Sequence, residues 1–467
     1  MAMKIFNTLT RKKEELKTIT EGELKMYACG PTVYNFIHIG NSRPLCVFDV
    51  MRRYMEYRGY KVNFVQNFTD IDDKIIKRAN EEGKTYREIA DTYIEEFWTD
   101  AKGLNVREAT THPKATENID EIISIIETLV EKGYAYQVDS DVYFSPSHFN
   151  EYGKLSHQPL EELEAGARIM VGEVKREPMD FALWKGAKPG EPYWESPWGH
   201  GRPGWHIECS AMVRRYLGET IDIHCGGQDL IFPHHENEIA QSECCNGKPF
   251  ANYWMHNGYI NVDNVKMSKS LGNFFTVRDV AEKYGYEPIR YLMISSHYRS
   301  PINYSVDIIE QCKASLTRLH TCRDSLDFEL SNVTADTADS DDAIFEQLNK
   351  RVAQFCEAMD DDLNTADALA SVFELVRDIN TSVIGKNASK AAVEKSIEIF
   401  DELTGILGIV YNRQKKTLDE DIEAMIEART SARKAKNWAE ADRIRDELKA
   451  QGIILEDTPN GVKWHRE

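Results

Sequence analysis

The chain lacks the features of a membrane protein or of a disulfide-stabilised secreted protein. No uninterrupted apolar run approaches the roughly 18 residues that a membrane helix needs. The start, MAMKIFNTLTRKKEEL, has no apolar segment followed by a small-residue cleavage site. Nine cysteines are spread over 467 residues and form no dense disulfide framework. We therefore expect a cytoplasmic protein whose cysteines are thiols, apart from any that hold a metal.

An excess of positive charge is also missing. The formal net charge is −20, which argues against a generally basic nucleic-acid binder. This charge does not exclude RNA, because a local basic patch can supply the phosphate contacts. What is present, 42% hydrophobic and 29% charged residues, is the mixture of a folded globular protein. The length suggests about three domains, at roughly 150 residues per domain.

The N-terminal part has the pattern of a parallel α/β sheet. A strand-like run at 24–29 is followed by an amphipathic segment at about 41–58 and a second strand-like run at 62–65. Strand, helix and strand in this order indicate a βαβ unit. The acidic run at 69–73 is typical of the N-cap and first turn of another helix.

This α/β pattern is interrupted and then resumes. Residues 112–204 are rich in Pro, Gly and Trp and have the character of an insertion into a sheet. The pattern returns with a strand at 221–224, a helix at about 235–245 and a strand near Tyr253. After about Pro301 we expect strand-like runs to stop and helical periodicity to continue through residues 305–410, with the aspartate run at 360–362 marking a helix junction.

Two short motifs suggest a nucleotide site. The HIGN run at 38–41 lies where the first strand gives way to a helix, whose free N–H groups suit a phosphate. The KMSKS run at 266–270 places two lysines in a loop, where they can follow the charge of a triphosphate as it cleaves. Taken alone, HIGN is better explained as a turn histidine and KMSKS as a solvated surface loop. Their order, about 230 residues apart, favours a shared site.

At these residues the sequence resembles the class I aminoacyl-tRNA synthetases, and within them the cysteine-specific branch. HIGN, KMSKS and an insert between two Rossmann-like halves carry the first likeness. The second rests on the stretches FTDIDDKIIKRA (68–79), DFALWK (180–185), GRPGWHIECSAM (201–212), FPHHENEIAQSE (232–243), VKMSKSLGN (265–273) and RKAKNWAEADRIRDEL (433–448). Together they cover essentially the whole chain, so the likeness is far more specific than either motif.

The resemblance implies an α/β fold with a Rossmann-like parallel-sheet catalytic domain that is split by an insertion. A helical bundle and a small C-terminal anticodon-binding unit should follow. We predict a first Rossmann half at 1–111, a connective insertion at 112–204, a second half at 205–260, a KMSKS-bearing stem-contact region at 261–304, a helical bundle at 305–411 and the C-terminal unit at 412–467.

The implied activity is that of a cysteine–tRNA ligase. It would activate L-cysteine with ATP and Mg²⁺ and transfer it from cysteinyl-adenylate to the 3′ end of tRNA(Cys), as a monomer without membrane contact. One alternative is a ligase that joins cysteine to a small amine, which would not need the C-terminal unit. Another is a non-catalytic tRNA-binding relative, which should have lost the lysines or the metal-binding residues.

Four residues carry the amino-acid selection that the resemblance implies. His234 and Glu238 are four residues apart and would share one face of a helix. Cys29 and Cys209 are distant in sequence, and each lies beside a motif. Spacing alone favours a surface pair for His234 and Glu238 and a buried small side chain for Cys29. The resemblance assigns all four as ligands of one Zn²⁺, which would bind a thiolate strongly and a neutral hydroxyl poorly.

The resemblance also assigns the ATP site. The ATP-binding residues are His38, Gly40, Asn41, Asp229, Lys266 and Lys269, and of these His38, Asn41, Lys266 and Lys269 are also the catalytic residues. Asn41 departs from the histidine of the general signature, so positive charge in the transition state should rest more on the lysines and on Mg²⁺. For Asp229 a turn cap is the alternative.

Two further sites are implied. Thr69 and Trp205 would line the amino-acid pocket, with ordinary packing as the alternative for Trp205. Trp438, Asp442 and Asp457 would bind the anticodon, and an alternative is a charged helical hairpin with Trp438 in its core. Cations available for tRNA phosphates in this unit are Arg429, Arg433, Lys434, Lys436, Arg443 and Arg445.

Overall fold

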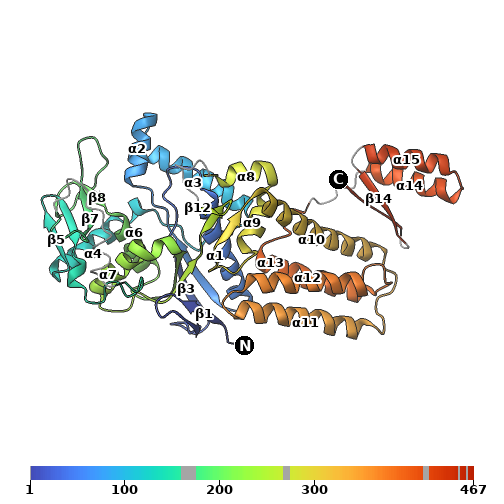
Figure 1. Ribbon diagram of the computed structural model, residues 1–467, viewed down its shortest axis with the longest axis horizontal. Coiled ribbons are helices and arrows are strands. Elements are labelled where there is room, and N and C mark those ends of the chain that lie inside the picture. The colour runs from blue at the N-terminus through green and yellow to red at the C-terminus, as the bar shows by residue number, and fades with distance from the viewer. Residues whose placement is uncertain are drawn as a thin grey trace. The chain divides into compact units, whose positions relative to one another are not determined.

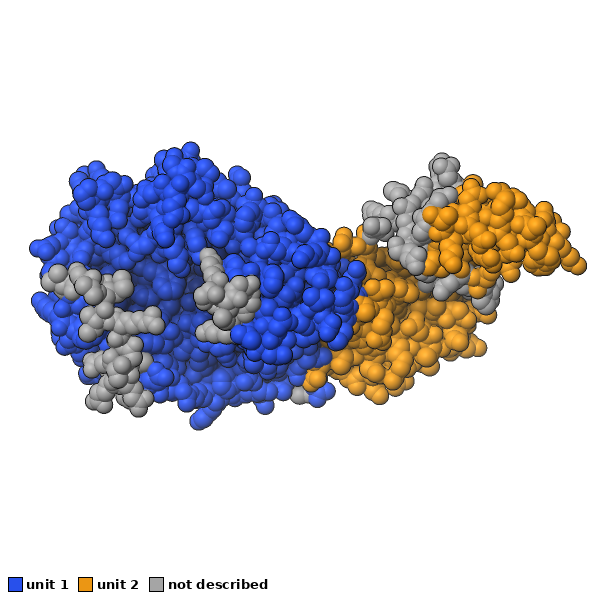
Figure 2. Space-filling model, turned by 45° about the horizontal axis from the view of Figure 1, so that its top comes forward, with its two compact units in different colours: residues 1–313, 357–366, 406–408 blue, residues 314–356, 367–405, 409–467 orange. Residues whose placement is uncertain are grey.

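The structure is a computed structural model that describes residues 2–158, 175–266, 274–413, 420–450, 453–458 and 461–466. Across these ranges no helix has the length and apolar character needed to cross a membrane. The chain divides into two compact units (Figure 2). Unit 1 comprises residues 1–313, 357–366 and 406–408, and unit 2 comprises residues 314–356, 367–405 and 409–467.

A four-stranded parallel sheet lies at the centre of unit 1, with strand order β10-β9-β3-β4. Its strands are β3 (Glu23–Ala28), β4 (Lys61–Gln66), β9 (Ile221–Gly227) and β10 (Ala251–Asn257). Two strands precede the long segment 67–220 and two follow it, so segments far apart in sequence form one sheet (Figure 1). Six of the seven residues of β9 are buried, as expected of a strand covered on both faces. The predicted Rossmann-like α/β fold is confirmed.

Helices connect and flank this sheet. Helix α1 (Ile39–Tyr57) joins β3 to β4, and α2 (Asp73–Glu82) and α3 (Tyr86–Gly103) follow β4. Asp72 caps α2 by accepting the N–H of Lys74 at 2.8 Å, as the acidic run predicted. Asp70 has another role, since its carboxylate accepts the N–H of Thr116 at 3.0 Å.

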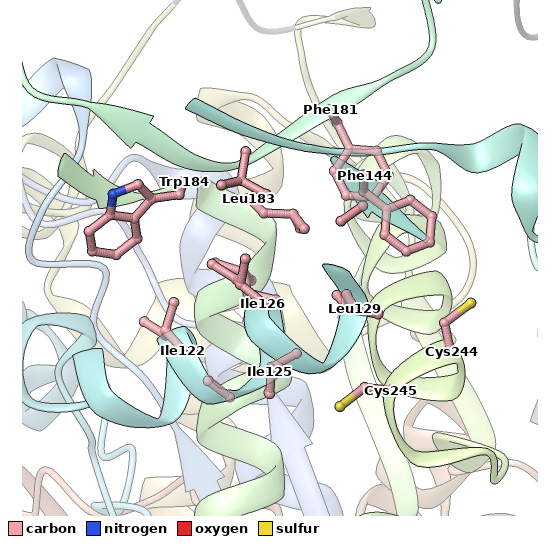
Figure 3. Close-up of a cluster of buried hydrophobic side chains, with 14 of the residues drawn as sticks. Ile122, Ile125, Ile126, Leu129, Phe144, Phe181, Leu183, Trp184, Cys244 and Cys245 are labelled. Atoms are coloured by element: carbon pink, nitrogen blue, oxygen red, sulfur yellow. The ribbon is translucent and has the colours of Figure 1, made fainter. Parts of the chain in front are cut away.

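The segment between the two pairs of strands forms a second, antiparallel sheet of order β5-β6-β7-β8. Its elements are α4 (Ile119–Glu131), β5 (Ala135–Val138), β6 (Asp141–Phe144), β7 (Phe181–Gly186) and β8 (Gly201–Pro203). Helices α6 (Trp205–Tyr216) and α7 (Glu236–Asn246) belong to the second half of the parallel-sheet region. Figure 3 shows isoleucines of α4 facing side chains of β6 and β7, with Cys244 and Cys245 of α7 at the edge of this cluster.

Short strands and helices complete unit 1. They are β1 (Lys4–Asn7), β2 (Lys12–Glu15), β11 (Ile260–Val262), β12 (Val265–Lys266), α8 (Val277–Tyr284), α9 (Tyr286–Ile294) and β13 (Ile302–Tyr304). The expectation that strands stop after about Pro301 was wrong, because β13 pairs in parallel with β11. A strand of three residues is too short for an alternating pattern to be visible in the sequence.

Unit 2 is built largely from helices. Helices α10 (Val306–Asn332), α11 (Asp341–Asp360), α12 (Thr365–Ser382) and α13 (Lys390–Leu407) lie side by side (Figure 1), and the ends of α10, α11, α12 and α13 that fall in 306–313, 357–366 and 406–408 belong to unit 1. The predicted helix junction at 360–362 is confirmed, since α11 ends at Asp360. The C-terminal part contains α14 (Glu420–Lys434), α15 (Trp438–Ala450), β14 (Ile453–Thr458) and β15 (Gly461–Arg466). The last two form an antiparallel hairpin, which is a second exception to the expected end of strands.

Candidate active site

Two cysteines, a histidine and a glutamate from four parts of the chain meet beside the parallel sheet. Cys29 directly follows β3, Cys209 lies on α6, His234 lies in the turn before α7 and Glu238 lies in the first turns of α7. One ligand atom from each lies within 4.8 Å of the others. His234 is outside α7, because residue 232 is extended and the regular helix begins at Glu236. The four-residue spacing still brings the His234 ring to the Glu238 carboxylate.

The distances within this group fit one tetrahedral metal ion. The two sulfur atoms are 3.8 Å apart, Cys209 Sγ is 3.7 Å from His234 Nε2, and Cys29 Sγ is 3.4 Å from Glu238 Oε1. His234 Nε2 lies 3.0 Å from Glu238 Oε1. Ligands at zinc–sulfur and zinc–nitrogen bond lengths in a tetrahedron are separated by about 3.3–3.8 Å. The mixture of sulfur, nitrogen and oxygen donors is one that Zn²⁺ accepts.

A second group shares two of these residues. His235 Nε2 lies 3.4 Å from Cys29 Sγ, and His224 Nε2 lies 2.8 Å from Glu238 Oε2, so these side chains also satisfy the spacing of a metal site. His234 and Cys29 face one carboxylate oxygen of Glu238 and His224 faces the other. With this arrangement, one oxygen of Glu238 can bind a metal while His224 holds the other oxygen by a hydrogen bond. Sequence reasoning assigned neither His224 nor His235, since nothing in their spacing indicated where their rings would point.

The electrostatics of the group favour a bound cation. Burial would raise the pKa of Glu238, but His224 and His234 hold it down at about 2, so the carboxylate is ionised. Burial raises the pKa of Cys29, and the hydrogen bond from Cys29 lowers the pKa of Cys209 to about 6. The hydrogen bond between the two thiols thus favours the thiolate form of Cys209. A divalent cation at this point would stabilise both thiolates.

The two predicted pocket residues lie next to this group. The ring of Trp205, at the start of α6, is 4.3 Å from the ring of His234 with an interplanar angle of 30°. Its side chain is 42% exposed, so it covers the metal-binding group rather than filling a core. Thr69 is buried and donates its hydroxyl to Glu208 Oε2 at 2.9 Å. Glu208 was not anticipated, and only the fold brings it to Thr69.

Backbone hydrogen bonds join the HIGN turn to the segment that follows the KMSKS run. The N–H of Ile39 donates to the carbonyl of Phe275 at 3.0 Å, and the N–H of Val277 donates to that of Ile37 at 3.0 Å. The segment that follows KMSKS is therefore paired with the HIGN turn at the N-terminus of α1. Lys269 lies outside the described residues, and so does the side chain of Lys266, whose backbone belongs to β12.

The structure gives Asn41 a defined orientation. His38, Gly40 and Asn41 form the first turn of α1, and Asn41 Oδ1 accepts the N–H of His38 at 3.2 Å. The side-chain oxygen thus caps the helix, which leaves the amide nitrogen as the group that can donate to a phosphate. A histidine here would offer a cationic donor, and this asparagine offers a neutral one in a fixed position.

Asp229 lies in the turn after β9 and is exposed. Within the described part of the chain its carboxylate accepts no hydrogen bond, so it does not act as a turn cap there. The neighbouring Gln228 donates its side-chain N–H to the carbonyl of Arg299 at 3.3 Å.

The predicted anticodon residues Trp438 and Asp457 differ in their surroundings. Trp438 is 58% exposed, so the alternative that placed it in a small core was wrong. The core consists instead of Ile426, Ile444, Leu448 and Ile453. Arg429 holds Asp457 at 2.8 and 3.0 Å, which keeps the pKa of Asp457 below its usual value.

Most of the cations expected to meet tRNA phosphates are already in ion pairs within the unit. Besides Arg429, these are Arg433 with Asp457, Arg443 with Glu440 and Glu447, and Arg445 with Asp442 and Asp446. Among the described residues Lys434 and Lys436 form no ion pair and are exposed.

Comparisons with known proteins cover the chain from end to end. Residues 15–314 match the family described as the catalytic domain of class I (C) tRNA synthetases, residues 354–411 match the DALR domain, and residues 415–464 match the cysteinyl-tRNA ligase anticodon binding domain. A cysteine–tRNA ligase of Caldicellulosiruptor saccharolyticus is 56% identical over 466 residues, which are 99% of this chain and 100% of that protein.

Solved structures of two more distant proteins share the fold. Mycobacterium tuberculosis methionyl-tRNA synthetase in complex with methionyl-adenylate gives a TM-score of 0.61 at 16% identity, over 82% of this chain and 90% of that one. The LeuRS of Agrobacterium radiobacter K84, in a ternary complex with tRNA and LeuAMS, gives 0.60 at 10% identity, over 84% and 85%. At these identities the likeness concerns architecture alone.

Proposed function

Since this chain belongs to the cysteine–tRNA ligase family of class I aminoacyl-tRNA synthetases, we propose that it activates L-cysteine with ATP and loads it onto tRNA(Cys) in the cytoplasm. The observation that carries the proposal is the group of Cys29, Cys209, His234 and Glu238, in a chain whose HIGN turn is paired with residues 275–277, after the KMSKS run. A non-catalytic relative would have no need of this combination.

We propose that the four residues hold one Zn²⁺, with His224 orienting Glu238 and with His235 beside Cys29. When bound, zinc would supply a Lewis-acidic centre that accepts a thiolate and takes a neutral hydroxyl poorly. Selection by volume alone gives only about 10–200-fold between small side chains. Cysteine and serine differ by one atom, so discrimination by the chemistry of sulfur is the more effective route.

The residues around the metal would then hold the rest of the substrate. Trp205 is exposed above His234 and offers a wall for the small side chain, while Thr69 fixes Glu208 at the base of the same pocket. The reaction requires the cysteine carboxylate to be held in line with the α-phosphate of ATP. Positioning of this kind contributes without any covalent enzyme intermediate.

For ATP, the first turn of α1 is the proposed phosphate site. His38, Gly40 and Asn41 lie at the N-terminus of this helix, whose dipole favours an anion, and the Asn41 amide nitrogen adds a neutral donor. Lys266 and Lys269 would add positive charge as the triphosphate cleaves, together with the Mg²⁺ that accompanies ATP. The exposed carboxylate of Asp229 suits the ribose hydroxyls.

We assign tRNA recognition to residues 412–467. Trp438 is exposed and available for stacking on an unpaired base, and Asp442 is exposed on the same helix. Asp457 joins β14 to α14 through Arg429, so its contribution combines base recognition with support of the unit. The other boundaries, at 111, 204, 260, 304 and 411, we propose as the limits of the Rossmann halves, insertion, stem-contact region and bundle.

The test is transfer of labelled cysteine to a tRNA with a GCA anticodon, using native, zinc-stripped and zinc-restored protein. Charging that disappears on stripping and returns with zinc supports both the reaction and the metal. Charging that survives complete stripping contradicts the role of zinc. Cysteine-dependent pyrophosphate exchange without any charging contradicts tRNA as the acceptor and favours a small amine.

A further inference from the structure

A fully buried aspartate, Asp362, makes contacts that the proposed reaction leaves unexplained. It lies in the turn 361–364 between α11 and α12, within unit 1. Its Oδ1 accepts the N–H of Phe6 at 2.7 Å and the hydroxyl of Tyr298 at 2.8 Å. Its Oδ2 accepts Nε of Arg299 at 2.8 Å and lies 3.4 Å from Nε2 of His297. One carboxylate thus holds three consecutive side chains, those of residues 297–299.

The backbone carbonyls of the same three residues accept hydrogen bonds from Arg43, Gly258 and Gln228, which we call the nucleotide side of unit 1 because they are close in sequence to the proposed ATP residues. The carbonyl of His297 accepts Nη2 of Arg43 at 3.2 Å, and that of Arg299 accepts the Gln228 side chain at 3.3 Å. Between them, the carbonyl of Tyr298 accepts the N–H of Gly258 at 2.8 Å. Each residue of the loop 297–299 therefore contacts Asp362 through its side chain and the nucleotide side through its carbonyl.

The partners of this loop are close in sequence to the proposed ATP residues. Arg43 is two positions after Asn41 in α1, and Gln228 directly precedes Asp229. Gly258 follows the last residue of β10 on the path to the KMSKS segment. A methyl group at Gly258 would lie 2.6–2.7 Å from the carbonyl oxygens of Ser300 and Arg299, so this contact allows no substitution without movement.

The position of the loop 297–299 affects the hydrogen bonds of Arg43. It is fully buried, and in the described ranges its guanidinium bonds to carbonyls and not to a carboxylate: Gly258 at 3.0 Å, Tyr259 at 3.1 Å and His297 at 3.2 Å. A buried cation held by dipoles alone depends on every one of them. If the loop shifts, Arg43 must follow it or lose a partner.

We propose that Asp362 is a positioning residue for the nucleotide site. It fixes the loop 297–299, and through the carbonyls of that loop it fixes Arg43 beside Asn41 and Gln228 beside Asp229. This inference rests on the proposed function, in which Asn41 and Asp229 bind ATP. None of these contacts involves the metal-binding group, so Asp362 affects the use of ATP and not the selection of cysteine.

The first variant is Asp362→Asn in the full chain. Asparagine tolerates the backbone angle of φ +66° and keeps the shape, but it removes the charge that faces Arg299. Cysteine-dependent ATP–pyrophosphate exchange is measured with ATP varied at saturating cysteine, and then the reverse. We expect the KM for ATP to rise about tenfold or more, since small displacements of reacting groups are costly. The KM for cysteine and the zinc content stay at the wild-type values.

Two further variants make the result specific. Asp361→Asn is the matched control, because the neighbouring carboxylate is 57% exposed and pairs with Lys13 at the surface. It should leave both KM values unchanged. Arg299→Gln breaks the same ion pair from the loop side, and it should reproduce the selective effect on ATP even where Asp362→Asn does not fold.

The outcomes separate this inference from the proposed function. A selective rise in the KM for ATP in both Asp362→Asn and Arg299→Gln supports it. An unchanged KM for ATP in a folded but less stable variant, or an equal rise for both substrates, overturns it and leaves a purely structural residue. Wild-type protein without cysteine-dependent exchange would instead refute the proposed function, and this inference with it.

Discussion

At the scale of single residues, the metal-binding group combines donors that have different tasks. Cys29 and Cys209 bring sulfur, which binds Zn²⁺ strongly as a thiolate, whereas His234 and Glu238 bring a nitrogen and an oxygen donor. His224 forms a hydrogen bond with Glu238, and His235 contacts the sulfur of Cys29. A change in a ligand should therefore act on metal binding far more than on folding.

Cys209→Ser should lose zinc and cysteine activation while the protein remains folded. Serine keeps the size of the side chain but not the thiolate, which is the metal ligand. Zinc content and cysteine-dependent pyrophosphate exchange measure the effect. Cys244→Ser is the matched control, since Cys244 packs in the core cluster beside α4 and lies in neither ligand group. Full activation with unchanged selectivity in Cys209→Ser would contradict the proposed site.

His112 should make the stability of unit 1 depend on pH. Its ring stacks on Phe68, and burial lowers its pKa to about 4. The unfolded chain takes up a proton near pH 6.5 and the folded chain does not, so stability present above pH 6.5 is lost as the pH falls towards 4. The slope is at most about 1.4 kcal/mol per pH unit. His112→Phe keeps the aromatic stack and should flatten the slope of the unfolding free energy against pH; identical slopes would exclude His112 as the cause.

At the scale of elements, the two helices that carry metal-binding residues are supported from one side by α4. Side chains of α4 lie in one cluster with Ile207 and Ala211 of α6 and with Ala240 of α7. Ile126 of α4 is fully buried in this cluster, where β6 and β7 cover it (Figure 3). The insertion thus contributes to the stability of the helices that place Cys209 and Glu238.

Ile126→Ala should destabilise unit 1 by about 2–5 kcal/mol, the usual cost of removing a large aliphatic side chain from a close-packed core. The expected result is a lower thermal midpoint in calorimetry, with the wild-type zinc content at room temperature. Ile123→Ala, on the same helix but only partly buried, should cost clearly less. Equal losses for the two variants would mean that the cluster is not packed as described.

At the scale of the whole molecule, the chain separates chemistry from recognition of the anticodon. Cys29, Cys209, His234, Glu238 and the HIGN turn belong to unit 1, while Trp438, Asp442 and Asp457 belong to unit 2. The last part of the chain has its own small core of Ile426, Ile444, Leu448 and Ile453. The described residues that we propose for cysteine activation all belong to unit 1.

Deletion of residues from 412 onward should impair tRNA charging much more than adenylate formation. The reason is that the deleted segment carries the proposed anticodon contacts and none of the residues proposed for ATP, cysteine or zinc. Charging kinetics and pyrophosphate exchange are compared on the same truncated protein. Equal losses in both steps, with unit 1 still folded, would contradict the assignment of this segment.

Much of this architecture was predictable because local patterns specify it. Hydrophobic residues in the runs at 24–29, 41–58 and 62–65 recur with the period of a strand or of a helix. The structure has β3, α1 and β4 at these places. The acidic run before α2 supplied its cap in Asp72. Where a pattern was too short or too charged, as in β13 and the C-terminal hairpin, prediction failed.

The sequence alone determined the α/β fold class, the family, and the residues that make up the motifs. The tertiary structure decided which distant side chains meet: that Cys29 lies 3.8 Å from Cys209, that His224 and His235 support the group, and that Asp362 holds the loop 297–299. The physical reason is the distance along the chain over which each kind of interaction acts. Helices, strands and caps follow from neighbours in the chain, whereas contacts such as that between Cys29 and Cys209 form only when the strand order of the sheet brings separate segments together.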